Sequence, residues 1–92
     1  MAVRADEVTP GEFFMAEGQE LRKVFRVATD DRGITCVWYQ CKAAAVSGQP
    51  LLFGHTQANP PTLDRFIAGC AYRLSSPELD ELRRRGILLR YE

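Results

Sequence analysis

The chain has 92 residues, which is enough for one domain and too few for two. Hydrophobic residues make up 46% and charged residues 26%, a globular composition that excludes a disordered chain. Its 12 basic and 12 acidic residues cancel, so wholesale binding to nucleic acid through a basic surface is not expected. No apolar run approaches the roughly 18 residues that a membrane-spanning helix needs.

The cysteines and the first residues indicate where the protein resides. Cys36, Cys41 and Cys70 are an odd number of thiols, so they cannot all pair within the chain. The N-terminal residues lack the apolar segment of a signal peptide. We therefore expect a cytoplasmic protein with free thiols. The odd thiol and a sheet edge allow either a monomer or a homodimer.

The charges are unevenly distributed along the chain. Residues 1–20 carry one basic and five acidic residues, a net charge of −4. Residues 21–42 carry five basic and two acidic residues, a net charge of +3. The two segments either lie together and pair, or lie apart and leave a polarised surface; the sequence leaves both arrangements open.

The first half of the chain predicts a β-hairpin. Residues 1–10 are polar and end at a Pro-Gly turn signal, so we expect a loose N-terminal arm. Residues 12–16 predict a short strand. Residues 21–29 and 34–42 predict two longer strands, rich in β-branched and aromatic residues. The Asp-Asp-Arg-Gly segment at 30–33 is typical of a tight turn between them.

Alternation along the two hairpin strands predicts which side chains share a face. In the first strand, one face would hold Leu21, Phe25 and Val27, and the more polar face Arg22, Val24, Arg26 and Ala28. In the return strand both faces are apolar, with Ile34, Cys36 and Trp38 on one and Val37, Tyr39 and Cys41 on the other. This pattern predicts a return strand that is covered on both sides.

The second half predicts a short strand at residues 51–55, then an irregular segment and two helices. The first helix begins after Thr62, and Leu63, Phe66, Ile67 and Cys70 would form its apolar stripe. In the second helix Ser76 caps, Pro77 takes the first position and Gly86 ends it. A short strand at residues 87–91 would follow. The fold class is therefore α+β: a small antiparallel sheet or SH3-like barrel of three to five strands with two C-terminal helices.

No catalytic, metal-binding or cofactor signature stands out. The spacing of Cys36 and Cys41 places their side chains on opposite faces of one strand, which is unsuited to chelating one ion. Cys70 fits core packing. His55 is the lone histidine, and no thiol or orienting group is placed beside it. We expect no enzyme activity, no metal and no cofactor.

The segment Arg22-Lys23-Val24-Phe25-Arg26 resembles half of the PilZ family signature. The resemblance implies that Arg22 and Arg26 share a strand face and grip the phosphates of a cyclic dinucleotide. The second PilZ motif, an Asp or Asn followed by a serine and a glycine, is absent. A broader alternative is single-strand nucleic-acid binding, with bases stacked on Trp38 and Tyr39. Its basic residues would be Arg22, Lys23, Arg26, Arg32 and Lys42.

The order of a short strand, a basic and aromatic hairpin, a loop and a further short strand resembles the SH3-like barrels of small phage and plasmid accessory proteins. The segments 20–27 and 37–40 carry this likeness. It implies a stand-alone module that binds a protein partner, as phage-type inhibitors of host defence proteins do. We therefore expect a non-enzymatic protein-binding module. The acidic residues Asp6, Glu7, Glu12, Glu17 and Glu20 are its predicted contact surface.

Overall fold

The computed structural model describes residues 3–54 and 57–92. Within these ranges the chain forms one 3-10 helix, five strands and two α-helices. They are η1 (Ala5–Glu7), β1 (Phe13–Ala16), β2 (Glu20–Thr29), β3 (Thr35–Ala43), β4 (Leu52–Phe53), α1 (Leu63–Gly69), β5 (Cys70–Arg73) and α2 (Ser76–Arg84). None of the helices in the described part of the chain is long and apolar enough to cross a membrane.

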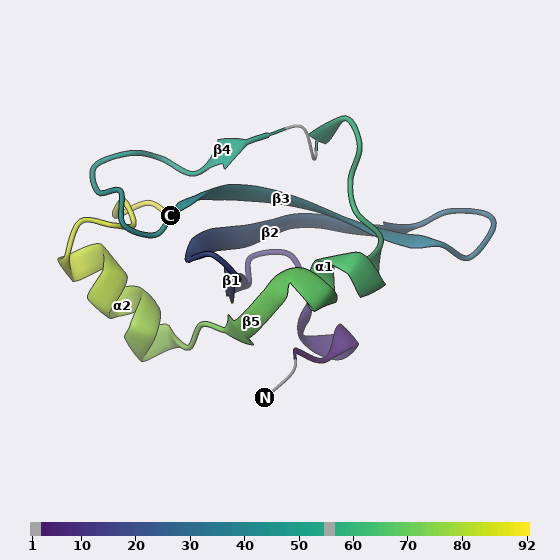
Figure 1. Ribbon diagram of the computed structural model, residues 1–92, viewed down its shortest axis with the longest axis horizontal. Coiled ribbons are helices and arrows are strands. Elements are labelled where there is room, and N and C mark those ends of the chain that lie inside the picture. Colours follow the sequence, from purple (N-terminus) through teal and green to yellow (C-terminus); the bar gives the residue numbers. More distant parts are fainter. Residues whose placement is uncertain (1–2, 55–56) are drawn as a thin grey trace.

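The strands form one antiparallel sheet in the order β4-β3-β2-β1-β5 (Figure 1). β4 and β5 are its two edges, and the sheet is open. The predicted α+β class is confirmed. Of the two predicted architectures, the open sheet on helices forms and the closed barrel does not. The hairpin of β2 and β3 extends well beyond the other strands, as Figure 1 shows.

Each face of the sheet packs against a different helix. On the face that we call the first face, Phe14 and Tyr39 contact Phe66 of α1, with ring centroids 5.6 and 5.2 Å apart. On the opposite, second face, Phe13 packs in one cluster with Leu82 of α2. Successive side chains of β1 therefore pack alternately into the two cores, and all four residues of this strand are buried.

A β-bulge in β2 changes which side chains share a face. Val24 lies opposite Tyr39 and Arg26 lies opposite Trp38, so Phe25 is an extra residue in this strand. Arg22 and Val24 lie on the first face, whereas Arg26 lies on the second. The prediction that Arg22 and Arg26 share a face is therefore wrong. The grouping of Phe25 with Val27 is also wrong, since Val27 packs against the core of the first face.

The turns and helix ends follow the predicted chemistry closely. Asp30 Oδ1 accepts the backbone N–H groups of Arg32 and Ile34, both at 2.9 Å, and Gly33 has a φ of +82°. In α2 the N-cap is Ser75, one residue before the predicted Ser76. At the other end, where Gly86 was predicted to end the helix, the Ile87 N–H donates to the Leu82 carbonyl and so closes a Schellman motif.

Three segments differ from their predictions. Helix α1 ends at Gly69, so Cys70 begins β5 instead of extending the helical stripe, although it is buried as predicted. Residues 87–91 form turns and not a strand. Residues 3–10, which are part of the predicted loose arm, include η1 and place Val3 and Val8 in the core of the first face.

Candidate functional site

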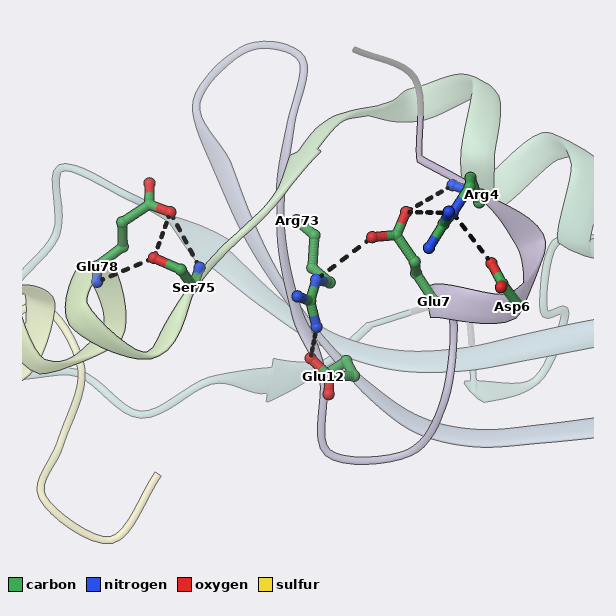
Figure 2. A network of polar contacts seen from close by, with 7 residues as sticks. All are labelled: Arg4, Asp6, Glu7, Glu12, Arg73, Ser75 and Glu78. Carbon is green, nitrogen blue, oxygen red and sulfur yellow. Dashed lines mark hydrogen bonds and ion pairs between the residues drawn. The ribbon is translucent and has the colours of Figure 1, made fainter.

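The acidic segment before the hairpin is largely neutralised within the molecule. Arg73 of β5 lies between two of its carboxylates, 3.5 Å from Glu7 and 3.3 Å from Glu12 (Figure 2). Arg4 lies 3.3 Å from Asp6 and also contacts Glu7. With Glu20, which pairs with Arg22, four of the five residues of the predicted acidic contact surface have a basic partner within the molecule.

Glu17 and Glu20 lie at the turn between β1 and β2. Glu20 accepts a hydrogen bond of 2.6 Å from the Arg22 guanidinium. Glu17 is exposed, and no ion pair involves it within residues 3–54 and 57–92. One open carboxylate is a weak electrostatic surface, because exposed single charges contribute little to binding.

Arg22 packs into the first face of the sheet. Its guanidinium carbon lies 4.7 Å from the Tyr39 ring centroid and 5.6 Å from that of Phe66. Gly69 makes room for it, since a Cβ there would lie 3.1 Å from the guanidinium. Tyr39 itself is only 7% exposed. Arg22 and Tyr39, both predicted to contact nucleic acid, are therefore parts of the folded interior.

Arg26 lies on the second face, above an aromatic ring that remains half-buried. Its guanidinium carbon is 4.7 Å from the Trp38 ring centroid. Phe25, the bulge residue, is 56% exposed, and its ring meets Phe53 of β4 at 5.0 Å with an interplanar angle of 83°. Lys23 lies on the same face, 5.4 Å from the Phe13 ring. We call the set Lys23, Phe25, Arg26, Trp38 and Phe53 the hairpin surface.

The other predicted basic residues lie elsewhere. Arg32 is exposed at the hairpin tip. Lys42 donates from Nζ to the Gln49 carbonyl at 2.6 Å and to the Ile87 carbonyl, so it ties the turns after α2 to the loop after β3. Of the five residues predicted for nucleic-acid binding, the structure brings only Lys23 and Arg26 together.

The hairpin surface is open because α2 covers another part of the second face. Leu82 packs near Phe13, Met15 and Leu21, toward β1 and the start of β2. Figure 1 shows α2 at the end of the sheet that lies away from the hairpin tip. The prediction that the return strand is covered on both sides holds for its first-face residues, Val37 and Tyr39, and fails at Trp38.

A hollow of about 610 Å³ lies between α2 and the β1–β5 edge of the sheet. Its rim carries Glu78, Glu81 and Arg85, which are charges of both signs. Ser75 hydrogen bonds lower the pKa of Glu78, and the Arg84 guanidinium lowers that of Glu81. Both carboxylates are thus engaged within α2, and the rim has no charge pattern that favours a particular ligand.

Two of the three thiols lie in surroundings that disfavour their ionisation. Burial raises the pKa of both Cys41 and Cys70, which disfavours the reactive thiolate. Among the described residues no group of three or more His, Cys, Asp or Glu side chains could hold a metal ion. His55, the one histidine considered for acid–base chemistry, lies outside the described residues.

Comparison with known proteins adds no relative. No protein-family model, no curated protein and no solved structure matches this chain. The residue that the sequence did not indicate is Phe53, because its contact with Phe25 depends on the bulge and on the pairing of β4 with β3.

Proposed function

We propose that this chain is a non-enzymatic protein-binding module that docks its partner on the hairpin surface. The observation that carries the proposal is the cluster of exposed Phe25, exposed Arg26 and half-buried Trp38 on a stretch of sheet that no described helix covers. Tryptophan, tyrosine and arginine are the residues that most often contribute binding energy at protein interfaces. Phe25 and Phe53 add apolar area next to this pair.

The ring arrangement favours a protein over single-stranded nucleic acid. Base stacking needs open ring faces. Here the Arg26 guanidinium already lies over the Trp38 ring, and the Phe25 and Phe53 rings meet edge to face. Lys23 and Arg26 are also few cations for neutralising a phosphate backbone. A protein partner gains from burying apolar area at any ring orientation.

Peptide selection followed by binding measurements tests this function. Random peptides displayed on phage are selected on the whole protein, and the enriched peptides are synthesised and titrated by fluorescence polarisation. We expect Phe25→Ser and Trp38→Ala to weaken binding by about tenfold or more each, because each removes a large buried contact. Tyr91→Ser is the matched control, since Tyr91 is 79% exposed but lies outside the hairpin surface.

The same measurements identify the outcomes that contradict the proposal. Peptides that bind wild type, Phe25→Ser and Trp38→Ala equally well would place the interface elsewhere. Failure to enrich any peptide, combined with salt-sensitive binding of oligo-dT that Trp38→Ala abolishes, would assign the surface to nucleic acid instead. Circular dichroism of each variant shows whether it is folded before it is titrated.

A further inference from the structure

The hairpin surface continues into a small hollow toward the hairpin tip. Ala28 and Cys36 lie opposite each other in the β2–β3 ladder, and their short side chains leave a space of about 290 Å³ on the second face. The segment before α1 forms one wall, because the Val37 N–H donates to the Pro61 carbonyl at 3.0 Å. We call this hollow the socket; its lining consists of Arg26, Ala28, Thr29, Asp30, Ile34, Cys36, Trp38 and Pro60.

The size of the socket suits a single side chain. Pockets for small-molecule ligands begin at about 300 Å³ and extend to about 1,000 Å³, so this hollow lies at or below their lower limit. Its lining is largely apolar, and Ala28, Ile34, Trp38 and Pro60 contribute to it. An apolar side chain that enters it loses contact with water without leaving a polar group unpaired.

Two charged side chains line the socket, Arg26 and Asp30. Arg26 is exposed and has no carboxylate partner among the described residues. A guanidinium that lies over an aromatic ring keeps the N–H groups at its edge available for a carboxylate. Asp30 also borders the socket, but its Oδ1 already accepts two backbone N–H groups of the turn.

We propose that the socket receives one apolar side chain of the protein partner and that Arg26 binds a carboxylate next to it. The partner segment is therefore apolar and acidic, with the two groups close together. This inference rests on the proposed protein-binding function and names the chemistry that the hairpin surface recognises. The Arg26 guanidinium, which has no carboxylate partner among the described residues, and the volume of the hollow are its two supports.

Cys36 allows a direct test, because its thiol lies in the lining of the socket. The whole protein is incubated with fragments that carry an aminoethyl disulfide, in competition with β-mercaptoethanol. The Cys36 thiolate attacks the fragment disulfide, which forms a mixed disulfide and releases cysteamine. Four fragments on one linker are compared: an isobutyl group with a carboxylate, the same group with a carboxamide, the same group with an amine, and the carboxylate without the isobutyl group.

We expect the isobutyl carboxylate to label Cys36 at the highest concentration of competitor, as located by peptide mapping and mass spectrometry. Its advantage over the carboxamide should be about two- to fivefold, the range of an exposed ion pair. Arg26→Gln should remove that advantage. Ala28→Leu should remove the advantage of the isobutyl group, whereas Ala71→Leu, an exposed alanine on β5, should not.

Equal labelling by all four fragments would overturn the socket, and so would a preference for the amine or an advantage that survives Arg26→Gln. The test needs no macromolecular partner, so it is separate from the peptide titrations. If the fragments label Cys36 equally but Phe25→Ser still weakens peptide binding, the socket alone is refuted. The reverse pattern refutes the protein-binding function of the hairpin surface and leaves the socket as a site for small molecules that are apolar and carry a carboxylate.

Discussion

Arg22 and Arg26 are four residues apart on one strand, yet the bulge gives them different roles. Arg22 donates to Glu20 at 2.6 Å and lies against the rings of Tyr39 and Phe66 on the first face. Arg26 is exposed on the second face, and its guanidinium lies over the Trp38 ring. Arg22 thus stabilises the fold, and Arg26 is available to a partner.

This division predicts opposite consequences for the two alanine variants. Arg22→Ala should lower the free energy of unfolding by about 1–3 kcal/mol, because it removes packing as well as a charged hydrogen bond. Arg26→Ala should lower it by about 1 kcal/mol or less, the range of an exposed cation–π contact. Urea denaturation followed by circular dichroism measures both. Equal losses in the two variants would contradict the separation of roles.

At the scale of elements, α2 is the one whose ends are most fully specified. Ser75 accepts the Glu78 N–H at 3.4 Å, and Glu78 accepts the Ser75 N–H at 3.0 Å, which together form a capping box. Ser75→Ala should therefore lower the free energy of unfolding by about 0.5–2 kcal/mol. Ser76→Ala is the matched control, and it should change stability by less than about 0.5 kcal/mol.

The capping box also predicts the direction of a pH dependence. Hydrogen bonds from Ser75 lower the pKa of Glu78, so their contribution to stability is present above the ordinary carboxyl pKa. It is lost as the pH falls through the lowered pKa of the folded state. The difference in stability between wild type and Ser75→Ala should accordingly shrink in acid. A difference that is constant from neutral pH to acid would contradict the role of the Glu78 carboxylate.

The elements that the sequence predicts well carry their signals locally. The Asp30–Gly33 turn and the Gly86 helix end each depend on residues within a few positions. Strand β5 was missed because Leu63, Phe66, Ile67 and Cys70 continue at helical spacing, whereas the strand is formed by pairing with β1. Tertiary pairing of this kind leaves no periodic mark in four residues.

The candidate site was only partly predictable for a related reason. Arg26 and Trp38 can be recognised as binding candidates by residue type, because arginine and aromatic residues are enriched at protein interfaces. The face on which Arg26 lies could not be assigned, because no residue type in the segment 24–27 marks the bulge at Phe25. The acidic segment is less available as a contact surface than its charge suggests, because Arg73 forms ion pairs with Glu7 and Glu12. Arg73 lies on β5, a strand that the sequence did not predict.

At the scale of the whole molecule, the two cores share strands β1 and β2, and β2 places Val24 in one core and Leu21 in the other. Phe14 is fully buried in the core of the first face, and its neighbours Phe13 and Met15 are buried in that of the second. A loss of packing on either face therefore destabilises β1, which pairs with β2 on one side and with β5 on the other. The domain should unfold as one cooperative unit.

Substitutions in the two cores test this coupling. Phe14→Ala and Leu88→Ala, one in each core, should lower the free energy of unfolding by about 3–5 and 2–5 kcal/mol respectively. In each variant the fluorescence of Trp38 and the far-ultraviolet circular dichroism should still change at the same urea concentration, because β1 cannot keep one core while losing the other. Leu52→Ala is the control, since Leu52 is 61% exposed and should cost less than about 0.5 kcal/mol. Two separate transitions in either core variant would show that the faces fold independently.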